Sequence, residues 1–280
     1  MARFRDVKSV SVFGTPWTGV QNVSVNVEAD SFESSGDNNI DIRRVDVTKQ
    51  KITFTIEVQD PDFKRDIKDP AFGSSPGVSL NEVQKISLKQ SCSVLTDSAE
   101  EDQWITYIGT TKAKTEAEVE LRDISQIRTE GTIKIGDKDS LIFKVLPGAS
   151  TSGLADSSAY EQFEGKNMVV TGITGGEKHG EVNGGTLSMI GFGDDSNVAR
   201  IYNTLSGGGS SGFEKHCGDT GTVSWTSPSV SGSGGDEDVS IANCVCTGVE
   251  IEASHAGRLT RRFTFEAYSS DGSTTPLTLS

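Results

Sequence analysis

The chain has 280 residues, of which 34% are apolar and 31 are glycine, with 40 acidic against 26 basic residues and a formal net charge of −14. This composition allows one large or two modest packed domains and excludes collagen-like and disordered chains. The acidic balance argues against an outer surface that grips nucleic acid, because affinity for phosphate comes mainly from Lys and Arg. No apolar run approaches the ~20 residues that cross a bilayer. Residues Met1–Asp6 lead into no apolar signal segment, so we expect folding in a cytoplasm.

Four cysteines, Cys92, Cys217, Cys244 and Cys246, are too few for a disulfide framework in a chain of this length. Cys244 and Cys246 are two residues apart in a strand-like run and therefore point to one face. We expect all four to be buried, unpaired thiols.

Alternation of apolar and polar residues, with many β-branched and aromatic side chains, predicts strands through most of the chain. The first covers Val7–Phe13 and ends at Gly14-Thr15-Pro16. The second covers Val20–Ala29, with Val23, Val25 and Val27 on one face. Further strands are predicted at Ile52–Val58, Ile86–Leu95, Gln103–Thr110, Ala117–Arg122, Gly131–Ile135, Leu141–Val145, Asn167–Thr171, Gly185–Phe192, Gly221–Trp225, Val239–Glu252 and Leu259–Tyr268.

The segments between the strands give turns, loops and little helix. Gly136-Asp137-Lys138 predicts a hairpin turn between the strands at 131–135 and 141–145. Short helices are predicted at Leu80–Val83, Asp156–Phe163 and Ser196–Leu205. Polar and Gly/Ser-rich composition predicts long loops at Asp30–Asp46, Pro147–Ser158, Ser206–Gly212 and Ser227–Asp238.

These elements predict a mostly β protein made of antiparallel β-sandwich or barrel modules, two in tandem, with short helices and long loops. The first β module would span residues 1–148 and carry the Asp30–Asp46 loop. Residues 149–158 would be a linker, and residues 159–280 would form the second β module.

Two pairs of similar strings occur near the two ends of the chain. Val25-Asn26-Val27-Glu28-Ala29 resembles Val249-Glu250-Ile251-Glu252-Ala253, and Phe54-Thr55-Ile56-Glu57-Val58 resembles Phe263-Thr264-Phe265-Glu266-Ala267. Two strands joined by a loop of variable length, present once near each end, would fit a duplicated β module. Chance is the alternative, because alternating strings of this kind are common in β proteins.

The strands at Val7–Val12 and Val20–Val27, joined across Gly14-Thr15-Pro16, and the closing stretch Phe263–Asp271 (FTFEAYSSD) resemble the tail tube proteins of tailed bacteriophages. The likeness covers about 60 residues at each end and is a pattern of strands. It implies a β-sandwich that closes into rings through shared sheets, usually as hexamers. Some members of that family carry two fused modules and form trimeric pseudo-hexamers, which the paired strings would suit. Residues 61–215 and the length depart from the family pattern.

No group of side chains predicts catalysis or ligand binding. The G-x-S-x-G string at Gly208–Gly212 lies in a Gly/Ser run, without the strand before and the helix after that a nucleophile elbow needs. Only His179, His216 and His255 are available as bases. Together with the cysteines they lack the spacing of a zinc knuckle, and the acidic turns at 36–41 and 193–197 do not fit a calcium-binding loop. We therefore expect no enzyme, no catalytic, cofactor-binding or metal-binding residues, and no cofactor.

Arg258, Arg261 and Arg262 form a small basic cluster in acidic surroundings. Solvation is the simplest interpretation of this cluster. Ion pairing between subunits comes next, and contact with nucleic acid comes last.

We expect a structural virion protein, a tail tube subunit that self-assembles into stacked trimeric or hexameric rings around a DNA-conducting channel. Its partners would be other copies, the tape measure and tail-end proteins, and genomic DNA passing through an acidic lumen without specific binding, with no membrane. It would be located in the virion after assembly in the host cytoplasm. The alternatives are a head-decorating or baseplate protein, or a carbohydrate-binding or adhesive β-sandwich. The last would need clustered exposed aromatics, whereas Trp17, Trp104 and Trp225 are scattered in the sequence.

Overall fold

The computed structural model describes residues 7–17, 19–34, 44–59, 66–73, 78–80, 82–97, 104–124, 133–146, 161–176, 179, 184–193, 200–203, 217–227, 236–255 and 259–280. Every regular element within these ranges is a β-strand, and the named strands pair only in antiparallel fashion. The predicted mostly β, antiparallel fold class is therefore confirmed.

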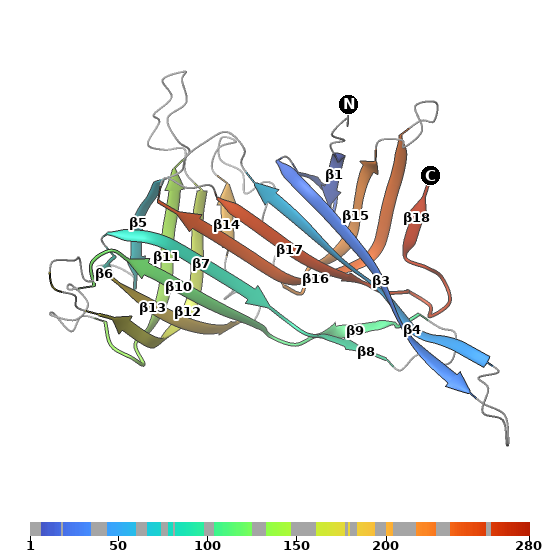
Figure 1. Ribbon diagram of the computed structural model, residues 1–280, viewed down its shortest axis with the longest axis horizontal. Coiled ribbons are helices and arrows are strands. Elements are labelled where there is room, and N and C mark those ends of the chain that lie inside the picture. Colours follow the sequence, from blue (N-terminus) through green and yellow to red (C-terminus); the bar gives the residue numbers. More distant parts are fainter. Residues whose placement is uncertain are drawn as a thin grey trace.

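Eighteen strands are described, and most belong to one continuous sheet (Figure 1). They are β1 (Lys8–Val12), β2 (Thr15–Pro16), β3 (Val20–Ser34), β4 (Arg44–Gln59), β5 (Asp66–Phe72), β6 (Val78–Ser79), β7 (Val83–Ser91), β8 (Val94–Thr96), β9 (Tyr107–Thr110), β10 (Ala113–Leu121), β11 (Lys138–Leu146), β12 (Glu161–Gly175), β13 (Gly185–Gly193), β14 (Arg200–Asn203), β15 (Thr220–Ser227), β16 (Glu237–Ser254), β17 (Thr260–Ala267) and β18 (Leu277–Leu279).

The main path of this sheet runs β3-β4-β17-β16-β7-β10-β13-β12-β11-β5-β6. A branch at β16 leads through β15 to β1 and β2, and β18 and β14 pair at the sides of β16 and β12. Strands β8 and β9 form a separate hairpin.

Strand β16, which is 18 residues long, belongs both to the main path of the sheet and to the branch through β15, β1 and β2. The two parts form two layers of the molecule. The first half of β16 pairs with β15 and β18, and its second half lies between β17 and β7. The pairing of β16 with β17 shifts between Cys246 and Gly248, where a bulge bends the strand. In Figure 1 the strand accordingly starts upright beside β15 and then turns along β17 and β7.

Aromatic side chains fill the space between the layers. The ring centroids of Phe54 and Phe265 are 5.0 Å apart, and Trp225 of β15 packs 6.5 Å from Phe54. Trp17 packs 4.5 Å from Phe263. Truncating such a buried aromatic to alanine costs about 3–5 kcal/mol of folding free energy, so these contacts hold the β1–β15 layer on the hairpins formed by β3 with β4 and β16 with β17.

The paired strings form two hairpins whose registers correspond over residues 24–28 and 248–252. In the first hairpin Val25 lies opposite Phe54, and in the second its counterpart Val249 lies opposite Phe263, the counterpart of Phe54. The next inward pairs also correspond: Val27 opposite Ile52, and Ile251 opposite Arg261.

The two hairpins meet along β4 and β17 in a way that is symmetric about the Thr55–Thr264 pair. Phe54 lies opposite Phe265, and Ile56, the counterpart of Phe265, lies opposite Phe263. The four strands β3-β4-β17-β16 therefore have an approximate two-fold relation. The two tryptophans obey the same two-fold relation. Trp17 precedes the first hairpin and packs on Phe263 of the second, and Trp225 precedes the second hairpin and packs on Phe54 of the first.

The expected helices are wrong where the structure describes them. Residues 161–163 belong to β12, Arg200–Asn203 form β14, and β7 begins at Val83. Phe163 pairs across β12 with both Phe143 and Ile201, and such pairing overrides a weak local preference for helix. Residues 156–160, 196–199 and 204–205 lie outside the described part of the chain.

Three further predictions need correction. Ile133–Ile135 form no strand, so Gly136 and Asp137 make a turn that bonds back to Val170 of β12 and joins no hairpin. The predicted strand at Ile86–Leu95 is two strands, β7 and β8, and that at Gln103–Thr110 shortens to β9. The predicted Asp30–Asp46 loop begins and ends in strand, because Asp30–Ser34 extend β3 and Arg44–Asp46 begin β4. Its remainder, 35–43, lies outside the described residues, as do the predicted loops at Pro147–Ser158 and Ser206–Gly212.

Strands from the two predicted modules are mixed within the sheet. Strand β7 of the first pairs with β16 of the second, β10 pairs with β13, β4 with β17, and β1 with β15. The division at residues 149–158 stays a prediction, since these residues lie outside the described part.

Candidate assembly surface

Among the residues that the structure describes, strand β3 has a neighbour on one side only and forms an open edge of the sheet. It is 15 residues long and pairs on one side with β4. Among the described strands with a single neighbour, β2, β6, β14 and β18 are each four residues or shorter. A long edge strand exposes a row of unpaired backbone N–H and C=O groups, which makes it a template for another strand.

The valines of β3 face the core side of the sheet but are left uncovered. Val25 and Val27 lie opposite Phe54 and Ile52, which are buried, yet the two valines are 40% and 55% exposed. Side chains directly opposite in an antiparallel pair share one face. The core-facing surface of the sheet therefore continues past the layer that covers it.

The second hairpin shows what covers the equivalent edge. Val249 and Ile251, the counterparts of Val25 and Val27, are only 5% and 1% exposed. Strand β7 lies along them and places Gln90 and Leu88 opposite. The open edge of β3 thus corresponds to an edge that is filled elsewhere in the same chain.

The backbone of β3 presents its free groups at the valines. On β16, the amide of Cys92 donates to the carbonyl of Thr247 (3.0 Å), and the amide of His255 donates to that of Gln84 (2.7 Å). The register of β7 on β16 has no shift between these two bonds, so every second residue from Thr247 to His255 points its N–H and C=O groups towards β7. Val249 and Ile251 are among these residues. The shared register of the hairpins assigns the same orientation to Val25 and Val27.

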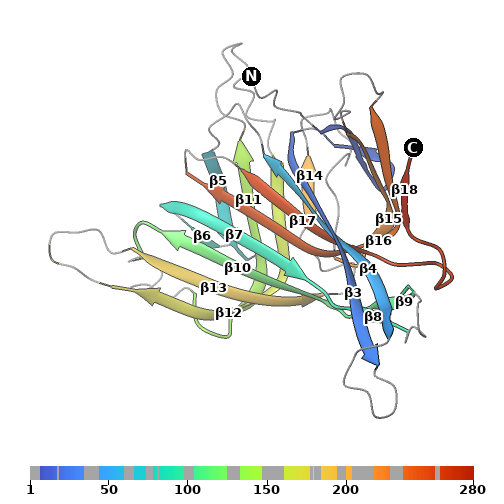
Figure 2. The same ribbon diagram turned by 45° about the vertical axis from the view of Figure 1, so that its right-hand side comes forward.

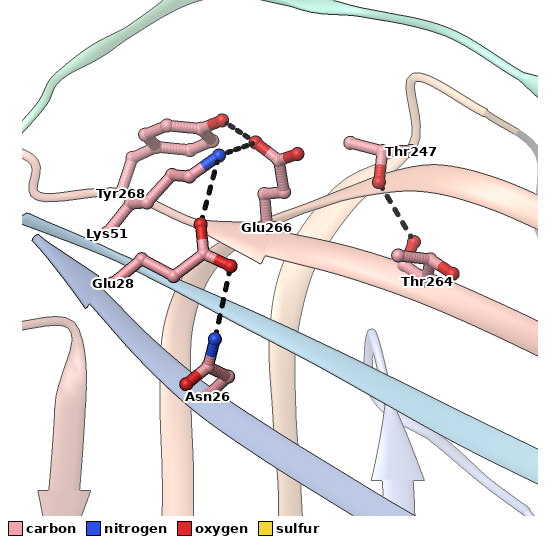
Figure 3. Close-up of polar contacts among 7 residues, drawn as sticks. All are labelled: Asn26, Glu28, Lys51, Thr247, Thr264, Glu266 and Tyr268. Carbon is pink, nitrogen blue, oxygen red and sulfur yellow. Dashed lines mark hydrogen bonds and ion pairs between the residues drawn. The ribbon is translucent and has the colours of Figure 1, made fainter.

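The opposite face of this edge carries a polar network that ties the two hairpins together (Figure 3). Lys51 of β4 lies 3.5 Å from Glu28 of β3 and 3.5 Å from Glu266 of β17. The side-chain amide of Asn26 donates to Glu28 (3.2 Å), and the hydroxyl of Tyr268 donates to Glu266. Burial, and then the neighbouring Glu266 carboxylate, raise the pKa of Tyr268 above its usual range. The network keeps this face polar, while the valine face is apolar.

Beyond a bulge between Glu28 and Asp30, the two strands continue as an arm. Lys49 has a φ of +53° at this bulge and lies 3.4 Å from Asp30. The ends of β3 and β4 project past the other strands in both views (Figures 1 and 2). Strands β8 and β9 lie near the base of this arm, where the amide of Ile105 donates to the carbonyl of Gln50 (3.1 Å).

Exposed apolar side chains gather around this arm. Val47 lies on β4, and Leu95, Tyr107 and Ile108 lie on β8 and β9, all exposed. A cluster of exposed large apolar residues on one part of a molecule is typical of a contact surface.

At the other end of the sheet, the described strands leave the outer edge of β5 partly open. Strand β6 pairs only with its last two residues, Ala71 and Phe72, and the amide of Leu80 donates to the carbonyl of Pro70. Next to Ile67 lies a depression of about 680 Å³. Its lining is mixed: Ile67, Pro70, Leu80 and Val83 are apolar, whereas most of the other residues, Lys85, Glu120 and Arg122 among them, are charged or polar.

The residues singled out from the sequence do not converge on a site. All four cysteines are free, as predicted; Cys217, Cys244 and Cys246 are buried and Cys92 is partly buried. Burial raises the pKa of Cys244 to about 12. Hydrogen bonds within the group Cys92, Cys217 and Cys246, and then burial, raise the pKa values of Cys92 and Cys217 above the usual range.

Other expected candidates lie apart or outside the described residues. Among the residues that the structure describes, no group of three or more His, Cys, Asp or Glu is placed to hold a metal ion. His179 and His255 are exposed, whereas His216 and Gly208–Gly212 lie outside the described part. Arg262 lies 3.4 Å from Glu250 and 3.8 Å from Glu57, within the same chain. Trp17 and Trp225 are buried and Trp104 is partly buried.

Sequence reasoning placed Val25 and Val27 on one face of a strand but missed that this strand is an edge. The similarity of the strings at 25–29 and 249–253 was the available signal. This similarity identifies the open edge only once β7 is known to cover β16 and not β3.

Comparison of the chain with protein-family models, with curated proteins and with solved structures found no match. No helix in the described part of the chain has the length and apolar character to cross a membrane.

Proposed function

We propose that this chain is a self-assembling structural protein, a tail tube subunit of a tailed phage or a phage-like particle. The observation that carries the proposal is the open edge of β3, with Val25 and Val27 facing the core side yet exposed. Pairing of this edge with a strand of another copy would satisfy its backbone groups and bury both valines. Copies joined in this way form a ring where the rotation between neighbours closes.

The energetics favour assembly at high local concentration. Fully burying a valine side chain is worth about 1.5–3 kcal/mol, so covering two half-exposed valines supplies about 2 kcal/mol per contact. Each net backbone hydrogen bond adds about 0.5–1.5 kcal/mol. These contributions act against the loss of translational and rotational freedom on association, and each ring closes several contacts at once.

Two features of the described part suit this role. The arm made by the ends of β3 and β4, with the exposed side chains near its base, supplies a surface for contact between stacked rings. The two related hairpins would let three chains present six similar units around a channel. A trimeric ring is therefore the form that we propose.

The charge of the chain suits the passage of DNA. A formal net charge of −14 per chain, repeated around a ring, gives a negative field that repels the phosphate backbone. DNA would then pass without specific binding. The tape measure and tail-end proteins would be the remaining partners, and the assembled tube would belong to the virion.

Analytical ultracentrifugation with electron microscopy of the purified protein tests this proposal. Rings or tubes should form as concentration rises, and Val27→Lys should abolish them while leaving the monomer folded. Monomers at all concentrations and salt conditions would overturn it. Monomers that bind glycans would support the adhesive β-sandwich in its place.

A further inference from the structure

We infer that β3 of one copy pairs with β5 of the next copy, antiparallel and head to tail, with Val27 opposite Ile67. This inference rests on the proposed self-assembly and names the partner strand of the open edge. It follows from strand direction and from the face that each strand presents.

Strand direction permits the join. Along the path β3-β4-β17-β16-β7-β10-β13-β12-β11-β5, every neighbouring pair is antiparallel. The number of strands on this path is even, so β3 and β5 run in opposite directions. When copies repeat head to tail around a ring, β3 of one therefore meets β5 of the next as an antiparallel strand.

The two strands also present matching faces. Val27 shares the core face with Ile52, and Ile67, which packs against the core, lies opposite Val145 of β11. Joining them places two apolar side chains on the same side of a continuous sheet.

The covered edge of β16 supplies a template for the register. There Leu88 of β7 lies opposite Ile251, the counterpart of Val27, and Lys89 and Lys85 pair with Glu250 and Glu252 at 3.0 Å each. Within β5, Lys68 follows Ile67 as Lys89 follows Leu88 in β7. Placing Ile67 opposite Val27 repeats this part of the pattern over Asp66–Asp69, the residues of β5 that β6 leaves free.

Charge argues against the simplest rival, which is pairing of β3 with itself about a two-fold axis. Residues 20–34 contain Glu28, Asp30 and Glu33 and no Lys or Arg. Lys51 and Lys49 of β4 lie beside Glu28 and Asp30, but a second copy of β3 adds acidic side chains and no further cation, and like charges across a strand pair are destabilising. Strand β5 carries one cation, Lys68, with Asp66 and Asp69 on the same strand.

Cysteine cross-linking between two single variants tests the inference. Val27→Cys and Ile67→Cys are purified separately, mixed under assembling conditions and oxidised with copper–phenanthroline. We expect a disulfide-linked pair of chains from the mixture and none from either variant alone, because directly opposite residues come close enough for a disulfide. Leu279→Cys is the matched control, since Leu279 is 57% exposed and lies on β18, and its mixture with Ile67→Cys should give no linked pair.

Assembly is followed separately by electron microscopy, with circular dichroism to confirm that each variant is folded. A linked pair from Val27→Cys alone would overturn the inference in favour of self-pairing. Tubes without a 27–67 link would overturn it and leave the proposed function standing, whereas absence of both tubes and links would overturn both. If Ile67→Cys fails to fold, the same mixture with Lys68→Cys and Asn26→Cys, the next pair in the register, decides between these outcomes.

Discussion

Substitution of one valine in each hairpin separates a role in assembly from a role in folding. Val25 and Val249 occupy corresponding positions, opposite Phe54 and Phe263, but they are 40% and 5% exposed. Alanine removes the same two carbons at each place. The chemistry is therefore matched, and only the covering strand differs.

The expected magnitudes follow from burial. Val249→Ala removes two buried carbons and leaves a cavity under β7, which costs about 2–3 kcal/mol of folding free energy. For a chain of this size that lowers Tm by about 4–10 °C. Val25→Ala should change the stability of the monomer by less than about 1 kcal/mol, but it should weaken self-association by about 1 kcal/mol per contact, or about fivefold in Kd.

Differential scanning fluorimetry of dilute protein gives the first quantity, and sedimentation over a range of concentrations gives the second. The reasoning would be refuted by two variants with the same profile. A large fall in monomer Tm for Val25→Ala, with association unchanged, would show that Val25 is covered within its own chain.

Three further outcomes are expected. Cys92, Cys217 and Cys244 should react slowly with a thiol reagent in the folded protein because their pKa values are raised, and Cys246 should react slowly because it is buried. Chelators should leave Tm unchanged, and stoichiometric zinc in the purified protein would contradict this. Stability should fall as the pH rises above the ordinary tyrosine pKa of 10, because the raised pKa of Tyr268 keeps the folded state protonated while the unfolded state loses its proton. Tyr268→Phe should reduce that alkaline loss, and an unchanged pH profile would count against it. In an assembled tube, the side chains that face the lumen should be mainly acidic. A lumen lined by Lys and Arg would contradict the proposed repulsion of the DNA phosphates.

The strands themselves could be predicted because alternation is a local property. The pattern of Ile52, Phe54 and Ile56 marks one buried face without knowledge of any neighbour, and all three are buried in β4. The string similarity marked two pairs of strands near the two ends of the chain, and residues 24–28 and 248–252 pair with β4 and β17 in corresponding register.

The order of strands could not be predicted, since it depends on partners distant in sequence. Nothing local in Val83–Ser91 indicates that it lies between β16 and β10, and nothing in β16 indicates that one strand serves two layers. The helix expected at Asp156–Phe163 failed for the same reason, because Phe163 is held by β11 and β14. The assembly surface was missed because an edge is defined by the strand that is absent beside it.

The central claim is that the free edge of β3 pairs when the protein assembles, and hydrogen exchange at single residues tests it most directly. In dilute monomer the outward amides of Val25 and Val27 should exchange rapidly, while the inward amide of Asn26, bonded towards β4, exchanges slowly. On assembly the account predicts that the amides of Val25 and Val27 become as protected as those of Val249 and Ile251, which β7 already covers. Assembled protein in which these two amides still exchange as fast as in the monomer would contradict it.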